Sequence, residues 1–384
     1  MNRRIASRLL ALALTLLLLL SFAGCATVGA RPSANARRVV ATAGEIEITY
    51  DELYYLANSR IRDLKAEHGE DALSDPAVMA ELESFVRENL FARSHVLIAL
   101  AEEYGISMDR GDIAAAIDAR LQKVLDEDFE GDREAYIESL NEAFLTERYV
   151  RTFIAVEDFL PNEIIKAMLE KGELDDSDAA GKAFVEGEDL IRVNQVLIEQ
   201  RNYVSPEAAR AKAEELRAKV AAVADPAARV DAMRSAMQFS TYIDEGYGLY
   251  FARGEMTEAF ESTAFSLELY GVSEVMEQNG DYYFLMRMPK EAAYMEENFE
   301  VLKQKSYFVA LNTAVETRYA ALTLEMTEFG EGLDLTDLDE IDAAGGELMM
   351  KLLAVGIGVA VLLVVLFVGR YFLRRHRANH HTVK

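Results

Sequence analysis

Few side chains in this 384-residue sequence could carry out nucleophilic, acid–base or metal chemistry. Cys25 is the only cysteine, and three of the 5 histidines lie in the basic stretch at the end of the sequence, which leaves His68 and His95. Two isolated histidines without a cysteine cluster do not make a zinc site, and neither has the neighbours of a Ser-His-Asp triad. No HExxH, P-loop or GxSxG pattern is present either. The residues therefore predict no metal, no cofactor and no hydrolytic centre.

Charge is distributed unevenly along the chain. The formal net charge is -26 at pH 7, although residues 1–25 and 349–384 are both basic, so the segment between them carries the acidic excess. Such a segment would be repelled by a phosphate backbone, and we expect no nucleic-acid partner. It could attract cationic unfolded polypeptides, or it could simply be a solvated surface that keeps the protein soluble.

The start of the sequence is typical of a secretory signal. Arg3, Arg4 and Arg8 precede a Leu/Ala run from Leu9 to Leu20, and small residues then lead to Cys25. We expect residues 1–25 to be a signal peptide. Its end resembles a lipobox with Cys25 as the lipidation site, while cleavage nearby without lipid and an uncleaved anchor remain open.

A second apolar run lies near the other end. Leu352 to Gly369 is uncharged and flanked by Lys351 and Arg370. Eighteen helical residues rise about 27 Å, close to a bilayer core of roughly 30 Å. The sequence thus predicts a transmembrane helix over 348–370 and a basic cytoplasmic tail over 371–384, with the folded part extracytoplasmic.

Between these ends, residues 26–38 are a tether and apolar spacings of three and four predict helices over 39–189. Val39 to Ile48 alternates as a strand does, and Thr49 with Glu52 forms a capping box that opens the first helix. A helix follows over 291–329, and the acidic, glycine-containing segment 330–347 predicts a stalk.

The pattern changes over residues 190–290. Ile191 to Ile198 alternates as a strand does, Ser205-Pro206 and Asp225-Pro226 are helix starts, and Asn279-Gly280 is a hairpin turn. The expected order is strand, helix, helix, strand, helix, strand, strand, which makes an α+β domain.

This domain resembles a parvulin-type (PpiC) peptidyl-prolyl isomerase. The resemblance is carried by Phe251-Ala-Arg-Gly-Glu-Met-Thr-Glu-Ala-Phe260, by Gly271-Val-Ser-Glu-Val275 and by the strand Arg192 to Ile198, while Ala43 to Glu52 resembles the start of the chaperone lobe of SurA-like and PrsA-like foldases. The resemblance implies an α+β fold in which N- and C-terminal segments form a helical chaperone lobe around the inserted parvulin-like domain. With the C-terminal transmembrane helix, this completes the predicted fold class.

The resemblance also implies which residues form the site. Leu249, Phe251, Met256 and Phe260 match the apolar pocket for a proline ring, although the spacing of Met256 and Phe260 also fits any amphipathic helix. Gln195 and Tyr283 stand where active members carry histidines, and Ser240 lies near the usual Cys/Asp position. Gln195 and Tyr283 can hydrogen-bond each other, but neither titrates near neutral pH.

The expected function is that of a membrane-anchored extracytoplasmic foldase that binds unfolded or proline-containing exported polypeptides, with weak isomerase activity. The alternative is a non-catalytic chaperone or structural binding module that uses a degenerate parvulin domain. The sequence predicts the same fold for both functions.

Overall fold

The computed structural model describes residues 35–242, 246–341 and 343, and the chain divides into two compact units. The first comprises the described parts of Met1–Glu102, Ser107–Phe159 and Ala320–Lys384. The second comprises Glu103–Ile106 and Leu160–Tyr319. The signal peptide 1–25, Cys25, the predicted span 348–370 and the tail 371–384 all lie outside the described residues.

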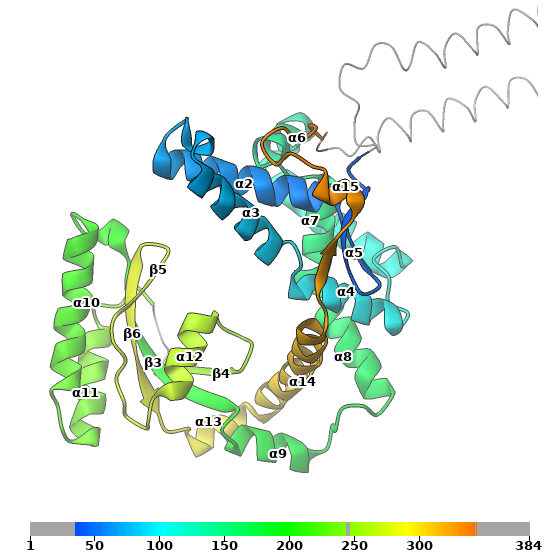
Figure 1. The fold of residues 1–384 in the computed structure, drawn as a ribbon. Helices are drawn as coiled ribbons and strands as arrows, with labels where there is room; N and C mark the ends of the chain where they lie inside the picture. Colours follow the sequence, from blue (N-terminus) through cyan, green and yellow to red (C-terminus); the bar gives the residue numbers. More distant parts are fainter. Residues whose placement is uncertain (1–34, 243–245, 342, 344–384) are drawn as a thin grey trace, which may run out of the picture. The chain divides into compact units, whose positions relative to one another are not determined.

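The first unit combines helices with a small sheet (Figure 1). Its strands run in the order β2-β1-β7, from β2 (Ile46–Thr49), β1 (Val39–Ala43) and β7 (Leu324–Met326). Its helical elements are α2 (Tyr50–His68), η1 (Ala72–Ser74), α3 (Pro76–Asn89), α4 (Arg93–Glu103), α5 (Gly111–Asp128), α6 (Arg133–Glu142), α7 (Glu147–Ile154), η2 (Ala155–Phe159) and α15 (Glu328–Glu331). The sheet joins segments from the two ends of the described chain.

Local details of this unit differ from the expectation. Val39 to Ile48 is a hairpin and not one strand, because Gly44 takes a positive φ of 63° that turns the chain between β1 and β2. Thr49 makes no side-chain cap. Its hydroxyl instead lies 2.7 Å from Asp51 Oδ1 and 2.8 Å from Glu52 Oε1, and it donates its one proton to either carboxylate.

A buried polar network surrounds the start of α2. Asp51 is 1% exposed and accepts hydrogen bonds from Thr146 Oγ1 (2.9 Å) and Arg148 Nε (3.0 Å). Glu52 contacts His95 Nε2 at 2.5 Å. Burial alone would raise the pKa of Glu52. The hydrogen bond and charge of His95, with smaller contributions from Thr49 and Arg148, outweigh this effect, so the pKa of Glu52 is lowered overall. The network therefore holds α2 and α7 together through charge-assisted hydrogen bonds.

The segment predicted as a stalk packs against the first unit as far as it is described. Ile341 and Ala343 are buried, and the backbone N–H of Glu147 donates to the Ala343 carbonyl at 2.8 Å. Tyr50 Oη donates to the carbonyl of Asp339 at 2.9 Å. The described acidic residues of the segment are exposed, as its composition indicated, while the buried Ile341 and Ala343 anchor it to the rest of the unit.

The second unit is built on a four-stranded antiparallel sheet of order β4-β3-β6-β5. The strands are β3 (Leu190–Ile198), β4 (Leu249–Ala252), β5 (Met276–Gln278) and β6 (Asp281–Met288). The helical elements are α8 (Leu160–Glu170), α9 (Asp178–Glu186), η3 (Gln200–Asn202), α10 (Pro206–Ala221), α11 (Pro226–Met237), α12 (Glu258–Ser266), α13 (Ala292–Glu297) and α14 (Phe299–Ala321). The predicted order of strands and helices over 190–290 is confirmed.

Turn and helix-cap residues explain why the sequence predicts this order of strands and helices correctly. Ser205 and Asp225 accept hydrogen bonds from Ala208 N and Ala228 N, each with proline in the first turn of the helix. Asn279 and Gly280 both take positive φ, as a type I′ hairpin requires. These short-range signals are strong because each satisfies backbone groups locally.

Two layers cover the sheet on opposite sides. Helices α10 and α11 pack on one face through a cluster that includes Val196, Leu216, Met233 and Phe284, while α12 covers the other face (Figure 1). Helices α9, α13 and α14 extend the first face around Leu190 and Tyr250. Residues 160–189 and most of 291–321 thus group with the sheet, whereas the sequence had placed them in the helical lobe.

The predicted fold class needs one correction. In the part of the chain that the structure describes, no helix is both long and apolar enough to cross a membrane. The long helices α2 and α14 carry charged residues throughout, and charged side chains are costly in a bilayer. No described helix thus supports the transmembrane component of the predicted fold class, and the predicted span, 348–370, lies outside the described ranges.

Candidate functional site

The side chains predicted for the apolar pocket meet on the α12 side of the second unit's sheet. We call this group the α12-face cluster. Its buried members are Ile191, Val193, Phe251, Phe260, Ala264, Tyr283 and Leu285, and Leu197, Leu249, Met256, Phe265, Leu267 and Met276 pack against them partly buried. The four residues proposed to bind substrate, together with Tyr283, therefore belong to one contiguous apolar cluster, of which Leu249 and Met256 are partly exposed.

Aromatic contacts organise the centre of this cluster. Phe260 stacks on Tyr283 with ring centroids 5.7 Å apart and an interplanar angle of 21°, and Phe251 meets Phe260 edge-on at 5.4 Å. Phe251 is fully buried and Phe260 is 6% exposed, whereas Leu249 and Met256 are only half-buried. Phe251 is thus a wall behind the site, and Leu249 and Met256 are the members within reach of a ligand.

The turn between β4 and α12 fixes the position of Met256. Its backbone N–H donates to Glu261 Oε1 at 2.9 Å. Glu255 accepts from the N–H of Ala252 at 2.6 Å and pairs with Lys305 of α14 at 2.6 Å. Carboxylates that bond to backbone donors on both sides of the turn restrict its conformation, so Met256 projects from a constrained segment.

The two polar residues of the predicted site, Gln195 and Tyr283, lie on the α12 face of the sheet on neighbouring strands. Gln195 of β3 is opposite Leu285 of β6, and Tyr283 is opposite Leu197. Side chains two residues apart on a strand share a face, so Gln195 and Tyr283 are diagonal neighbours. The predicted hydrogen bond between them is not formed among the described residues. Burial raises the pKa of Tyr283, which keeps its phenol protonated.

Ser240 has a backbone role in the structure. Its hydroxyl accepts the N–H of Leu197 at 3.0 Å and the N–H of Tyr242 at 3.1 Å. Strand β4 does not pair with this part of β3, so the Ser240 hydroxyl satisfies the Leu197 N–H that a neighbouring strand would otherwise bind. The N–H of Thr241 donates to the Leu197 carbonyl at 3.0 Å. Both hydrogen bonds occupy lone pairs of the Ser240 oxygen, which is typical of a side chain that satisfies backbone groups at a sheet edge.

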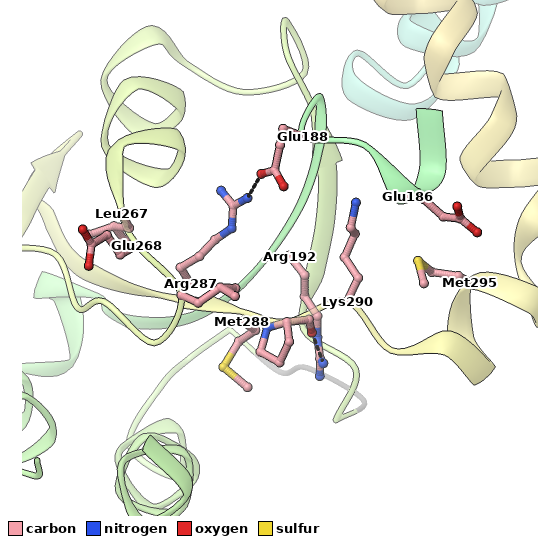
Figure 2. Close-up of a pocket in the computed structure, with 11 residues that line it drawn as sticks. Glu186, Glu188, Arg192, Leu267, Glu268, Arg287, Met288, Lys290 and Met295 are labelled. Atoms are coloured by element: carbon pink, nitrogen blue, oxygen red, sulfur yellow. Dashed lines mark hydrogen bonds and ion pairs between the residues drawn. The ribbon is translucent and has the colours of Figure 1, made fainter. Parts of the chain in front are cut away.

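A second feature of this unit was missed by the sequence reading. A cavity of about 600 Å³ lies at the other end of β6 (Figure 2). Its lining includes Arg287, Lys290, Glu188, Leu267 and Met295. Arg287 is 8% exposed, although it is an arginine within a strand. The available signal was the basic residue that interrupts the apolar run of residues 282–288.

Metal ligands do not gather in the second unit or elsewhere in the described ranges, where no group of three or more His, Cys, Asp and Glu side chains is suitably placed. His95 instead contacts Glu52, and His68 lies near Glu67 at the end of α2. The lipidation site proposed at Cys25 lies outside the described residues.

Comparison with known proteins supports the family resemblance. A model of the SurA-like N-terminal domain matches residues 1–157. The foldase protein PrsA of Clostridium tetani is 25% identical over 187 residues, which is 48% of this chain and 55% of that protein. The chain thus aligns with about half the length of this curated relative.

Solved structures of similar proteins were also found. PrsA of Streptococcus pneumoniae has 17% identity and a TM-score of 0.29, with 72% of this chain and 94% of that chain covered. PrsA of Bacillus subtilis has 20% identity and a TM-score of 0.22, with 74% and 91% covered. TM-scores this low do not establish a shared arrangement, so the resemblance depends on the sequence matches. With those matches, the predicted resemblance of this chain to SurA-like and PrsA-type foldases is confirmed.

Proposed function

We propose that this protein is an exported foldase that binds proline-containing segments of unfolded polypeptides on its α12-face cluster. The observation that carries the proposal is the convergence of Leu249, Phe251, Met256 and Phe260 in one apolar cluster beside Gln195, with Leu249 and Met256 partly exposed. Export is inferred from the basic and apolar segments of residues 1–25. The named relative, a foldase, supports the same class of function.

The proposed chemistry needs no nucleophile. Rotation about a prolyl peptide bond is slow because amide resonance is lost, with a barrier of about 18–20 kcal/mol. An apolar surface that holds the proline ring would take the amide out of water, and polar groups placed for the twisted amide would stabilise it. The Gln195 amide and the Tyr283 phenol are the groups we assign to this role.

A second candidate function is that of a non-catalytic binding module. The missing hydrogen bond between Gln195 and Tyr283 favours it, since a pre-organised pair would hold both groups in place for catalysis. Tyr283 is also engaged in stacking with Phe260, and its pKa is raised. In this case the same apolar face would bind unfolded chains without accelerating isomerisation.

Proline-limited refolding of a client protein, with the full-length protein added, tests the first function. Met256→Ala removes the accessible thioether and should abolish the acceleration. Met237→Ala is the matched control, because Met237 is also partly buried but packs on the opposite face of the sheet. Equal loss of activity in the two variants would contradict the assignment of the α12 face.

Binding of an unfolded polypeptide, measured in parallel, separates the two candidate functions. Gln195→Leu should lower the refolding rate and leave affinity nearly unchanged if Gln195 acts on the twisted amide. A wild-type protein that binds the polypeptide through Met256 but does not alter the refolding rate would establish the binding module instead.

A further inference from the structure

We propose that the cavity beside Arg287 binds a carboxylate group of the client polypeptide together with a neighbouring aliphatic side chain. The carboxylate belongs either to an acidic residue within the client or to the end of its chain. This inference rests on the proposed function, because it assumes a polypeptide ligand. It adds a second point of attachment at the end of β6, where Arg287 shares the α12 face and Met288 and Met295 belong to the opposite one.

The cations of the cavity are fixed and largely buried. Arg287 is held within β6, and its Nη1 makes a long contact of 3.4 Å to the Ala264 carbonyl. Lys290 Nζ donates to the carbonyls of Val185 (2.7 Å) and Gly187 (2.5 Å) at the end of α9. Arg287 and Lys290 extend toward the segment that carries Glu186 and Glu188, as Figure 2 shows.

These cations are incompletely neutralised. Burial lowers the pKa of both Arg287 and Lys290, because it removes water from their charged forms. Among the described residues no carboxylate lies within salt-bridge distance of Lys290, and Arg287 pairs only with Glu188. Arg192, the third cation of the lining, is already paired with Glu291 at 2.7 Å.

Glu188 occupies the site weakly. Its side chain is 93% exposed and meets Arg287 Nη2 at 3.3 Å, whereas charge-assisted bonds of this kind are usually about 2.7–2.9 Å long. Glu186 and Glu268, the other acids of the lining, are also exposed. The cations Arg287 and Lys290 are therefore held by β6 and the residues directly after it. The glutamates of the lining are on exposed side chains, which a ligand carboxylate can displace.

Apolar walls adjoin the cations and define the neighbouring group. Leu267, Met288 and Met295 line the cavity, and Leu269 is 59% exposed at its margin. An aliphatic side chain next to the carboxylate would cover these surfaces. The arginine fork and the lysine ammonium would contact the carboxylate itself.

The cavity is in line with the proposed proline site. Tyr283, Leu285 and Arg287 occupy every second position of β6, so their side chains share one face of the sheet. Arg287 and Tyr283 both contact residues of α12. Four residues of strand span about 13 Å, which is also the reach of about four residues of extended peptide. We take this length as the separation of proline and carboxylate in the test. Leu285 between them is fully buried beneath α12, so the client would contact the two ends and not the strand itself.

Fluorescence anisotropy with labelled peptides and the full-length protein tests the site. Four peptides share one proline and a leucine, and differ in an internal Asp or Asn four residues from the proline and in a free or amidated C-terminus. We expect replacement of the recognised carboxylate to weaken binding about tenfold. The sensitive position identifies the source of the carboxylate, and equal affinity of all four peptides would overturn the proposal.

Variants assign the effect to the cavity. Arg287→Met should remove the carboxylate dependence, while Arg234→Met, an exposed arginine of α11, should retain it. Glu188→Gln removes the weak internal competitor and should raise affinity for the acidic peptide several-fold. Because Glu188 is exposed, this variant will fold, and an unchanged affinity would contradict the proposal even if Arg287→Met unfolds.

Failure of this inference can be separated from failure of the proposed function. Met256→Ala should weaken the binding of all four peptides equally and preserve the difference between acidic and neutral ones. If the α12-face cluster is not a proline site, replacing proline by alanine in the peptide will leave affinity unchanged, whatever happens at Arg287.

Discussion

The ring of Phe260, on α12, stacks on that of Tyr283, on β6, at a centroid distance of 5.7 Å. This contact joins an apolar residue of the proposed proline pocket to a residue at one of the family's histidine positions. Because the phenol ring is held by stacking, removal of its hydroxyl alone can be distinguished from removal of the ring. The relationship therefore allows catalysis and packing to be tested separately.

Tyr283→Phe preserves the stacked ring and removes the hydroxyl. We expect peptide affinity and stability to stay close to wild type, while any prolyl isomerase rate falls about tenfold or more, because one hydrogen-bond donor to the twisted amide is lost. Tyr283→Leu should lower both affinity and stability. A Tyr283→Phe variant with an unchanged rate would assign the residue to packing alone.

Gly248, directly before β4, has no room for a side chain. It takes a φ of +75°, and a Cβ there would lie 2.7 Å from Asn194 Oδ1 and 2.9 Å from the Val193 carbonyl. Gly248→Ala should therefore displace Leu249 and weaken peptide binding, and should cost about 2–4 kcal/mol of stability. Gly246→Ala is the control, because its φ is +99° but nothing lies within 4 Å of its Cβ. Similar losses in both variants, measured by urea unfolding, would show that backbone strain alone is responsible.

The buried carboxylate of Asp51 should be essential to the first unit. Asp51→Ala removes the carboxylate that accepts from Thr146 and Arg148. It leaves Arg148, among the described residues, only the longer contact with Glu52 (3.5 Å) and the Thr49 hydroxyl. The substitution should lower the free energy of unfolding by about 2–4 kcal/mol. Asp118→Ala breaks a more exposed pair with Arg151 and should cost less than about 1 kcal/mol. Chemical denaturation of the two variants measures the difference, and comparable effects would refute the importance of the network.

Tyr136 gives a pH-dependent prediction. Burial, with a smaller contribution from Glu147, raises its pKa to about 12, and its hydroxyl has no hydrogen-bond partner among the described residues. A raised pKa in the folded state means that stability is complete below about pH 10, the pKa in the unfolded chain, and is lost as pH rises toward the folded value.

Tyr136→Phe keeps the edge-on contact with Phe129 and removes both the unpaired hydroxyl and its titration. The variant should be as stable as wild type or up to about 1 kcal/mol more stable at neutral pH, with an advantage that grows above pH 10. Urea unfolding at about pH 8 and pH 10.5 checks this. An advantage that shrinks with pH would contradict the burial of the phenol.

The sequence predicted residues 190–290 of the second unit well because the signals there are local. The proline-capped starts of α10 and α11, the Asn279-Gly280 turn and the alternation of β3 each act over a few residues. The motif from Phe251 to Phe260 also indicated apolar residues that the structure places in one cluster, and their role in binding stays a prediction. The structure adds that the Ser240 hydroxyl accepts two backbone N–H groups, which the family pattern does not indicate, and the assignment of Ser240 to the reacting groups stays a prediction.

The amino-acid sequence by itself determined the type and order of most strands and helices, the acidic character of the folded part and the resemblance to foldases, because these depend on short-range patterning and composition. Only the tertiary structure decided that β7 joins β1, that Asp51 meets Arg148, and that Arg287 and Lys290 share a cavity with Glu188. Each of these contacts joins residues from separate elements of the fold. Their energies come from burial and charge pairing that no local pattern encodes.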